Sequence, residues 1–304
     1  MKPVPGRLKK LRIGVLYGGR SDESEISRRT GKAVLNGLQK LGLHVSGIEV
    51  KTNLPQELLR KKINFCFIAL HGKYGEDGAV QGLCEMMGIP YSGSGVLSSA
   101  LSMNKARTKE TLLAHGIPTA PFQLVSSASE KIRLRLPFVV KPVDGGSAIG
   151  VTIVSKNSEI KNAVRLALRH SREILIEAFI PGREVTAPIL GGEALPLIEI
   201  VSKRSFYDFK AKYIKGMSDH ILPARVSKAI ETKIKNYALK IRRILGCRAF
   251  SRSDFIVDSK GNPWFLELNS IPGMTETSLF PESAAAAGYS FPEMLLKIIV
   301  ESER

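Results

Sequence analysis

Two carboxylates can be brought face to face within one short stretch of the chain. Residues 252–274 read as two strands joined by a turn at Lys260-Gly-Asn-Pro263. A tight turn places Asp254 opposite Glu267, and the alternation of side chains along a strand directs both to one face. Facing carboxylates repel unless a cation lies between them. Mg²⁺ takes oxygen ligands and is usually shared with substrate phosphates, so a magnesium and phosphate site is predicted.

Two more polar residues belong to the same face of this hairpin. Arg252 falls opposite Asn269, whose amide oxygen supplies a third ligand without a third negative charge. The guanidinium of the arginine can meet an oxyanion or a phosphate. An edge hairpin whose charged face is merely solvated is the alternative interpretation. The opposite face is expected to be apolar and to fit a core: Phe255, Val257, Trp264, Leu266 and Leu268.

The composition is that of an ordinary globular protein. The 304 residues are 43% hydrophobic and 7% aromatic, which is enough for two or three domains with their own cores. No apolar run reaches the ~18–20 residues of a membrane helix, and no signal peptide is expected. The three cysteines are widely spaced, which fits buried thiols in a reducing cytoplasm. We therefore expect a cytoplasmic protein.

The formal net charge of +17 is compatible with nucleic acid, a membrane surface or anionic small molecules as partners. The basic residues are spread over the whole chain, with no basic tail and no interleaving of basic and aromatic residues. A generally basic surface is the favoured interpretation. We expect small-molecule substrates, and neither a nucleic-acid nor a membrane partner.

The N-terminal third alternates strand and helix patterns, which indicates a parallel α/β sheet. Ligands of such sheets bind beyond the carboxyl ends of the strands. Glu23 follows the first strand and its Gly18-Gly19 turn, and His71 follows the third. Ser21 or Ser24 is expected to cap the helix after the turn, and Glu23 could be there only to suit the positive helix end. The expected strands are residues 11–17, 45–50 and 63–70.

A glycine-rich loop lies in the middle of the chain. Residues 136–142 predict a strand, residues 143–150 the loop, and residues 151–154 the returning strand. The backbone N–H groups of such a loop can meet phosphate oxygens, and Lys141 adds a positive charge beside it. It is not a P-loop, because no Gly-Lys-Ser/Thr sequence closes it. A flexible hairpin without a ligand is the alternative interpretation.

The remaining elements complete three predicted domains. Residues 203–223 form a long polar stretch rich in lysine, which indicates a lid loop over a triphosphate or a flexible linker. Helices are expected at residues 97–115, 157–172, 227–245 and 291–303, and further strands at 174–180, 184–190 and 195–201. The predicted domains are residues 1–93, 94–180 and 181–304.

Motifs along nearly the whole chain resemble the D-alanine–D-alanine ligases, a family of the ATP-grasp superfamily. The resemblance implies an N-terminal Rossmann-like domain with a parallel sheet and two α+β domains that enclose ATP. The motifs are, in chain order, Gly18-Gly-Arg-Ser-Asp-Glu23, His71-Gly-Lys-Tyr-Gly-Glu-Asp-Gly78, Met103-Asn-Lys105, Lys141-Pro142 with Gly146-Ser147, Glu177 to Glu184, Tyr207-Asp-Phe-Lys-Ala-Lys-Tyr213, Arg252-Ser-Asp254, Glu267-Leu-Asn269 and Pro272-Gly-Met-Thr275.

The activity that this resemblance implies is the ATP-dependent ligation of two D-alanines through an acyl phosphate. The products are D-alanyl-D-alanine for peptidoglycan precursors, ADP and phosphate. Two Mg²⁺ or Mn²⁺ ions and a homodimer are implied as well. The alternatives are a ligase that joins D-alanine to D-lactate or to D-serine, a basic nucleic-acid-binding protein, and an inactive ATP-binding relative.

The resemblance also assigns roles to individual residues. Glu23 would bind the ammonium of the first D-alanine, and Arg252 with the Gly273 N–H would form an oxyanion hole. Ser147 and Tyr213 would link Glu23 to the closed lid. The second D-alanine would be fixed by Lys212, Ser278 and the Leu279 N–H, with His71 close by. The residues implied for ATP are Lys105, Lys141, Glu177, Ala178, Phe179, Ile180 and Glu184, and those for the metal are Asp254, Glu267 and Asn269.

A few positions depart from the family pattern. Asn104 stands where the family has an aspartate, and the loop contains Asp144-Gly145 and then Ala148 in place of a serine. These departures put the affinity for ATP in question rather than the reaction. Tyr213 argues against the lactate alternative, where the resemblance leads us to expect phenylalanine.

Overall fold

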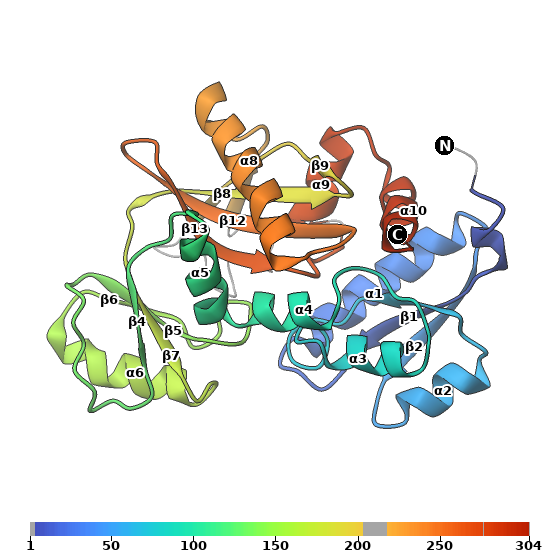
Figure 1. Cartoon of the computed structure of the whole chain (residues 1–304), viewed down its shortest axis with the longest axis horizontal. Coiled ribbons are helices and arrows are strands. Elements are labelled where there is room, and N and C mark those ends of the chain that lie inside the picture. The colour runs from blue at the N-terminus through green and yellow to red at the C-terminus, as the bar shows by residue number, and fades with distance from the viewer. Residues whose placement is uncertain (1–3, 203–217, 276, 304) are drawn as a thin grey trace.

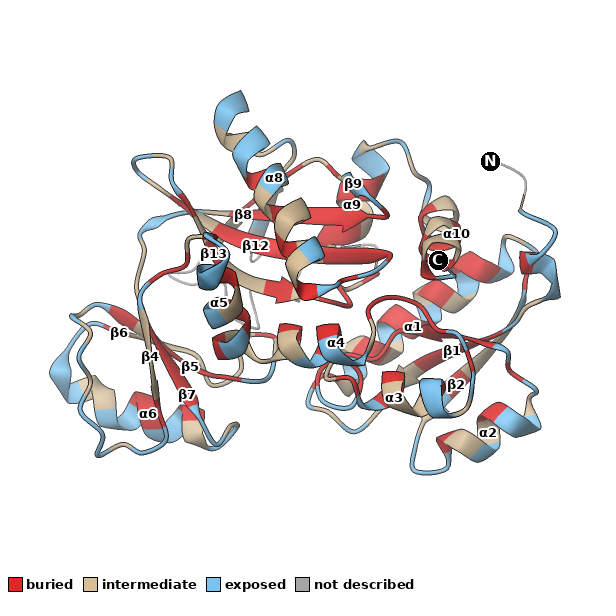
Figure 2. Ribbon diagram, in the orientation of Figure 1, coloured by how far each residue is buried: buried red, intermediate tan, exposed pale blue. Residues whose placement is uncertain are grey.

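The computed structural model describes residues 4–202, 218–275 and 277–303 of the chain. Three sheets follow one another in sequence, and each is covered by helices (Figure 1). The first sheet is parallel and the other two are antiparallel. Each has a hydrophobic core of its own beside it, and burial follows the strands closely (Figure 2). The two predicted domain boundaries, after residues 93 and 180, fall between these sheets, and the division into domains remains a prediction.

The first sheet has the order β2-β1-β3. Strands are present where the apolar segments predicted them, and the long helix after the first strand is also confirmed. The strands are β1 (Arg12–Gly18), β2 (His44–Val50) and β3 (Phe65–Ile68), and the helices are η1 (Leu8–Lys10), α1 (Ser24–Gln39), α2 (Leu54–Arg60) and α3 (Ala79–Met86).

The helix expected over residues 97–115 is in fact two helices, α4 (Val96–Met103) and α5 (Lys105–Ala114). Asn104 causes the break. It has extended backbone angles and its side chain accepts a hydrogen bond from the N–H of Arg107 over 2.9 Å, which caps α5. Asparagine and aspartate cap helices about equally well, so the departure from the family's aspartate preserves this local structure.

The second sheet has the order β4-β7-β5-β6 and contains the strand before the glycine-rich loop and the strand after it. The two strands pair as an antiparallel hairpin, as predicted. The strands are β4 (Phe122–Val125), β5 (Phe138–Pro142), β6 (Thr152–Val154) and β7 (Ile174–Ala178), with the helices η2 (Asn157–Glu159) and α6 (Ile160–Leu168).

The third sheet runs β11-β10-β8-β12-β13, and β9 pairs with β8. The end of the predicted lid loop is a strand, β11, while residues 203–217 lie outside the described part of the chain. The strands are β8 (Gly182–Leu190), β9 (Glu193–Ala194), β10 (Ile198–Ser202), β11 (Ser218–Ile221), β12 (Phe250–Asp258) and β13 (Pro263–Asn269), and the helices are α8 (Lys228–Leu245), α9 (Leu279–Ala286) and α10 (Phe291–Ser302).

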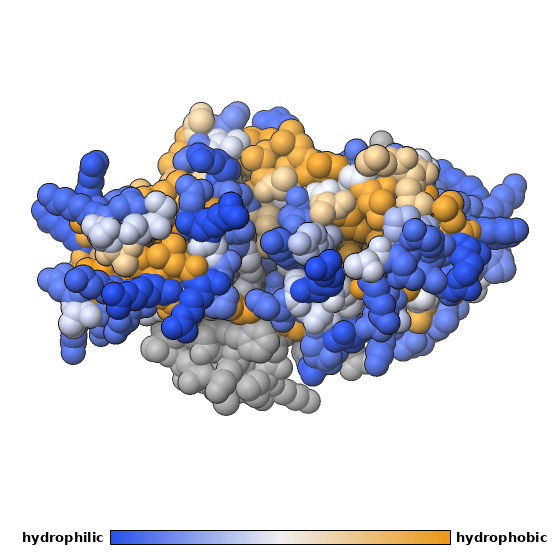
Figure 3. All heavy atoms as spheres, turned by 90° about the horizontal axis from the view of Figure 1, so that it is seen from below, coloured by the Kyte–Doolittle hydropathy of each residue, from blue (hydrophilic) through white to orange (hydrophobic). Residues whose placement is uncertain are grey.

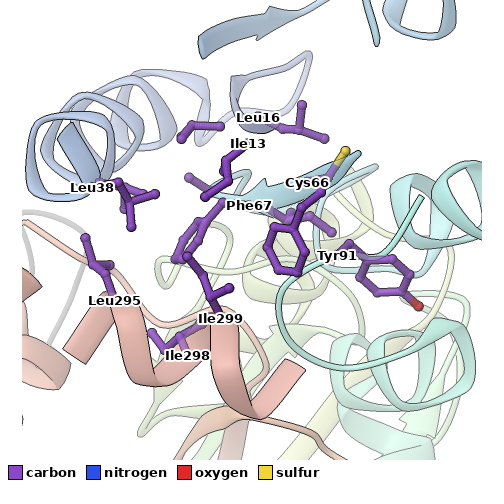
Figure 4. Packing of buried hydrophobic residues seen from close by; sticks show 14 of the residues in the cluster. Ile13, Leu16, Leu38, Cys66, Phe67, Tyr91, Leu295, Ile298 and Ile299 are labelled. Atoms are coloured by element: carbon purple, nitrogen blue, oxygen red, sulfur yellow. The ribbon is translucent and has the colours of Figure 1, made fainter. Parts of the chain in front are cut away.

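The two ends of the chain share one core. Leu295 and Ile299 of α10 point toward Leu38 of α1 and Phe67 of β3 (Figure 4). The Ser302 hydroxyl also accepts a hydrogen bond from the Gly93 N–H over 3.0 Å. Because α10 is anchored on the parallel sheet, the C-terminal loops are held against the loops at its strand ends. These contacts bring the candidate residues of the first and last thirds together.

The surface agrees with the composition. Hydrophilic side chains cover both ends of the molecule seen from below, and apolar side chains gather toward its middle (Figure 3). Within the described residues, no helix combines the length and the hydropathy that a membrane span would need. The cysteines Cys66, Cys84 and Cys247 are free and buried, as predicted. A hydrogen bond with Cys84, together with burial, raises the pKa of Cys66, so that thiol stays protonated.

Candidate active site

The hairpin of β12 and β13 carries the predicted carboxylate face. Asp254 pairs with Glu267 and Arg252 pairs with Asn269, which confirms the predicted register at this end of the hairpin. A β-bulge between Asp254 and Phe255 then shifts the register by one residue. Bulges add an unpaired residue and re-aim the side chains that follow.

Because of the bulge, the prediction for the apolar face is wrong at two residues. Trp264 and Leu266 were expected in the core, but both line a pocket on the other side of the strand pair. Phe265 takes their place: its ring packs edge-on against Phe255, with centroids 6.0 Å apart, and is fully buried. Val257 and Leu268 lie in the same core, as expected.

Asp254 is surrounded by hydrogen-bond donors. Its carboxylate accepts bonds from Arg252 Nε at 3.0 Å and Nη2 at 2.9 Å, which is a bidentate pair. Thr186 Oγ1 donates to it over 2.5 Å, and Asn269 Nδ2 over 3.2 Å. With its nitrogen turned to Asp254, the amide of Asn269 keeps its oxygen for another partner. Two carboxylates and an amide oxygen form a donor set that fits Mg²⁺.

The glycine-rich loop reaches this face through Lys105. The ammonium of Lys105 donates to the Gly145 carbonyl over 2.5 Å and lies 4.0 Å from Glu267 Oε2. Lys105 therefore joins the start of α5, the loop after β5 and the carboxylate of β13. Its positive charge therefore lies beside the glycine-rich loop, where the sequence predicted a phosphate site.

Glu23 is turned into the site rather than used as a helix cap. It occupies the N-cap position of α1 without a capping bond, and the Ser147 hydroxyl donates to its carboxylate. Two glycines leave room for the carboxylate in this position, because a Cβ at Gly72 would lie 2.7 Å, and one at Gly146 2.9 Å, from Glu23 Oε2. The predicted serine cap is wrong: Ser21 donates to the His71 carbonyl over 2.6 Å.

His71 is a neutral hydrogen-bonding residue at the base of this site. It is buried, and its Nε2 lies 3.0 Å from the Thr30 hydroxyl. Burial lowers its pKa to about 4; a bond with the backbone of Ile271 opposes this shift, and the positive charge of Arg252 adds to it. The imidazole is therefore uncharged at neutral pH and suits the positioning of a polar group.

Glu76 is a site residue that the sequence reasoning did not single out. It accepts a hydrogen bond from the Gly72 N–H over 2.7 Å and lines the same cavity as Glu23 and His71. Burial, together with the nearby charge of Glu23, raises its pKa to about 8, although hydrogen bonds from the backbone of Gly72 and Ile271 and the charge of Lys105 act in the opposite direction. The motif of residues 71–78 was noted in the sequence, but the closeness of two carboxylates is visible only in the fold.

The raised pKa of Glu76 predicts a pH-dependent cost to stability. Between its ordinary pKa of 4.5 and about 8, the folded protein binds a proton that the unfolded chain releases. Stability from this group is therefore complete at low pH and is lost as the pH rises through that range. The variant Glu76→Gln removes this dependence. We expect its melting temperature, relative to that of the unmodified protein, to rise steadily from pH 5 to pH 8.

Glu110→Gln is the control for this experiment, because Glu110 is exposed on α5, where it forms an ion pair with Arg107. It should show no such trend. A constant difference in melting temperature across the same pH range for Glu76→Gln would contradict the raised pKa.

The residues predicted for ATP line two adjoining pockets between the second and third sheets. One contains the apolar side chains of Trp264 and Leu266 and suits a flat ring. The other contains Lys105, Lys141 and Glu267 and suits phosphates. Glu177 and Glu184 line both pockets. The end of β7 and the residues after it line only the first: Ala178, Phe179 and Ile180.

Two backbone groups of that segment are already occupied. The N–H of Ala178 donates to the Pro121 carbonyl over 2.9 Å, and that of Phe179 to the Pro137 carbonyl over 3.2 Å. A nucleotide base in this pocket would therefore meet other atoms of the segment. The Glu177 carboxylate is also engaged, since Lys141 Nζ donates to its Oε2 over 2.5 Å.

The cavity beside Glu23 is completed by the loop before α9. Ser278 is the N-cap residue of α9, and its hydroxyl accepts a hydrogen bond from the Thr275 N–H over 3.0 Å. The N-terminus of a helix favours a carboxylate. The predicted residues that line this cavity are Glu23, His71, Ser147, Arg252, Asn269, Gly273, Ser278 and Leu279. Lys212 and Tyr213 lie outside the described residues.

The structure thus places a cavity lined by Glu23 and Arg252 next to a pocket lined by Lys105 and Lys141. Known proteins resemble the chain over nearly its whole length. A family model described as the N-terminus of D-ala D-ala ligase matches residues 47–94, and one described as its C-terminus matches residues 112–300. A D-alanine--D-alanine ligase of Pelotomaculum thermopropionicum is 49% identical, over 95% of this chain and 96% of its own length. One from Citrifermentans bemidjiense is 48% identical, over 96% of each.

Solved structures show the same fold. A D-alanine--D-alanine ligase from Bacillus anthracis superimposes with a TM-score of 0.87 at 36% identity, covering 97% of this chain and 98% of the other. The same enzyme complexed with ATP gives 0.85 at 34% identity, with the same coverage. A D-Ala:D-Ser ligase from Enterococcus faecalis gives 0.82 at 29%, covering 95% of this chain and 98% of the other. The expected ATP-grasp fold is confirmed, and the chain belongs to the D-alanine–D-alanine ligase family.

Proposed function

We propose that this protein joins two molecules of D-alanine to form D-alanyl-D-alanine, with ATP as the source of energy. The observation that carries the proposal is the adjacency of the two sites. A cavity with Glu23, Ser147 and Arg252 opens beside the phosphate pocket of Lys105 and Lys141. A relative that is 49% identical to this chain over nearly its full length is named for this activity.

The first step forms an acyl phosphate. The carboxylate of one D-alanine attacks the γ-phosphate of ATP, and ADP leaves. Glu23 binds the ammonium of this D-alanine, and the hydrogen bond from Ser147 fixes the orientation of the Glu23 carboxylate. The ammonium groups of Lys105 and Lys141 stabilise the charge on the phosphates. Asp254, Glu267 and Asn269 would hold Mg²⁺, which supplies further charge neutralisation when bound.

The second step forms the amide bond. The neutral amine of the second D-alanine attacks the acyl carbon, and the bond from that carbon to the phosphate oxygen breaks. Phosphate leaves with the bonding electrons and takes up the proton that the amine nitrogen loses. The guanidinium of Arg252 and the N–H of Gly273 stabilise the negative charge on the carbonyl oxygen. Ser278 and the N-terminus of α9 bind the carboxylate of the second substrate, with Lys212 as a further cation. Tyr213 on the lid closes the site against water, which would otherwise hydrolyse the acyl phosphate.

The dipeptide product would be used to make peptidoglycan precursors. We propose that the protein acts in the cytoplasm. Buried free thiols at Cys66, Cys84 and Cys247 support a reducing compartment. A homodimer is proposed from the family resemblance, and sedimentation equilibrium of the purified protein tests it directly.

The test of the function is a competition experiment read by mass spectrometry. The protein is incubated with ATP, Mg²⁺ and equal concentrations of D-alanine, D-lactate and D-serine. We expect D-alanyl-D-alanine as the main product at neutral pH, formed in step with phosphate release. A mixture with ADP in place of ATP is the control. A main product containing D-lactate or D-serine would overturn the choice of the second substrate, and no product at all would overturn the activity.

A further inference from the structure

We propose that Lys109 is a positioning residue of the ATP site. Lys109 shares the carboxylate of Glu177 with Lys141, and this sharing leaves the ammonium of Lys141 able to bind phosphate. The inference rests on the proposed use of ATP. It goes beyond the residues to which the family resemblance assigned a role, because Lys109 lines none of the pockets described above.

Lys109 is a completely buried lysine whose ammonium is surrounded by oxygen atoms. It lies on α5 and has 0% exposed surface. Its ammonium donates to Thr119 Oγ1 over 2.6 Å and to the Phe265 carbonyl over 3.1 Å, and it forms an ion pair with Glu177 Oε1. Two oxygen acceptors and one carboxylate therefore surround the three N–H donors of this ammonium. Burial of a charge at this depth is costly unless it is paired, which indicates a specific role.

Glu177 is the shared partner of two lysines. Its second oxygen, Oε2, accepts the bond from Lys141 at 2.5 Å. Burial alone would raise the pKa of Glu177, but the charges of Lys109 and Lys141 outweigh it and lower that pKa, so the carboxylate is ionised. Burial lowers the pKa of Lys109 to about 8, with Glu177 acting in the opposite direction, and at neutral pH most of it is charged.

The buried cluster of Lys109, Glu177 and Lys141 therefore carries one net positive charge. Lys141 is its only member that reaches the phosphate pocket as a cation, beside Gly145 and Gly146 of the glycine-rich loop. A phosphate group in that pocket would complete the charge balance. Without Lys109, Glu177 would neutralise Lys141 alone, and the cluster would offer a phosphate no net charge.

The position of Lys109 also connects the two sheets around ATP. Thr119 Oγ1 donates to the Phe265 carbonyl over 3.1 Å, and the Phe265 N–H donates to the Pro118 carbonyl over 2.8 Å. Lys109 thus joins α5 and β13 to β7, and α5 is seen between the two sheets in Figure 1. A purely structural role for Lys109 would act on the whole ATP site, whereas the electrostatic role acts on the phosphates only.

The variant Lys109→Met tests this difference, because methionine keeps the length of the side chain and removes its charge. Affinities for adenosine, ADP and ATP are measured by calorimetry with Mg²⁺ present and no D-alanine. We expect the affinity for ATP relative to that for adenosine to fall about tenfold, which corresponds to about 1.4 kcal/mol. ADP should be affected in the same direction.

A second substitution supplies the rescue. In Lys109→Met/Glu177→Gln the carboxylate is removed as well, so Lys141 regains its net charge. We expect the ratio of ATP to adenosine affinity to recover most of the loss. Lys240→Met is the matched control: Lys240 donates to the His115 carbonyl over 2.7 Å, just beyond α5, and is not a member of the cluster of Lys109, Glu177 and Lys141. Its ratio should equal that of the unmodified protein.

Each outcome decides the inference. Equal losses for adenosine and ATP in Lys109→Met, or no recovery in the double variant, would show a structural role and overturn the proposal. If Lys109→Met does not fold, Glu177→Gln alone is measured, and a fall in its ratio would overturn the proposal. Unmodified protein that binds ATP but forms no dipeptide would refute the proposed function and leave this inference intact.

Discussion

Replacing Glu267 with glutamine should reduce ligation by about a hundredfold or more while the fold remains intact, which corresponds to about 2.7 kcal/mol or more of transition-state stabilisation. Glu267 lies opposite Asp254 on β13, and its side chain is 22% exposed toward the phosphate pocket. Glutamine keeps its size and one oxygen but removes the negative charge that would hold Mg²⁺ on the phosphates. The core face of the same strand, with Phe265 and Leu268, is untouched.

The measurement is the rate of phosphate release as Mg²⁺ is varied, with circular dichroism and melting temperature as checks of the fold. Glu110→Gln is the control, because it removes a carboxylate from the exposed face of α5. It should retain the rate of the unmodified protein. If Glu267→Gln also retained that rate at every Mg²⁺ concentration, Glu267 would have no part in binding the metal.

The hairpin shows how far the sequence leads and where it stops. Strict alternation, together with the turn at residues 260–263, predicted that Asp254 faces Glu267, and this pair is present. The same alternation failed at Trp264 and Leu266, because a bulge inserts one residue next to the carboxylates. A bulge has no clear signal in a single sequence, since it depends on how the strand bends against its neighbours. The error placed two pocket residues in the core.

Buried charges are the other feature that the sequence does not reveal. Lys109 lies in the stretch Lys-Ala-Arg-Thr-Lys-Glu, which is typical of a solvated helix face, yet it is completely buried. Its partners Thr119, Glu177 and Phe265 come from three other segments. Glu76 is similar, because its raised pKa arises from burial and from Glu23, which is far away in sequence. Such clusters are created when segments that are distant in the sequence pack together, and no local pattern encodes them.

The predicted lid illustrates a third situation. Residues 218–221 pair with β10 as a strand, since the polar sequence Ser-Asp-His-Ile needs only the edge of an existing sheet to be ordered. Edge strands tolerate polar residues on both faces, so the lack of apolar alternation hid this one. The part of the lid that would carry Lys212 and Tyr213 is outside the described residues, and its role remains a prediction.

Replacing Arg252 with lysine should lower kcat by about a hundredfold to a thousandfold, the usual effect of removing one donor to a developing oxyanion. Arg252 holds Asp254 through two parallel bonds of 3.0 and 2.9 Å, and it lines the substrate cavity with Gly273. A lysine keeps the charge but cannot reproduce the planar fork, so it cannot serve the carboxylate and the substrate together. The affinity for ATP should change much less than kcat, because the phosphate pocket contains Lys105 and Lys141 instead.

Comparison with Arg252→Met separates the two roles of the guanidinium. Asp254 is buried, and without any cation beside it the variant should lose about 3–5 kcal/mol of stability, as expected when one partner of a buried pair is removed. The lysine variant should lose less stability than the methionine variant and yet be similarly slow, because charge suffices for Asp254 while the oxyanion needs the oriented donor. Arg248→Lys, at an exposed arginine just before β12, is the control and should change neither property. Stopped-flow measurement of a single turnover and thermal unfolding provide the two readouts. A lysine variant with full kcat would mean that Arg252 acts only to hold Asp254, and the oxyanion role would pass to Gly273 alone.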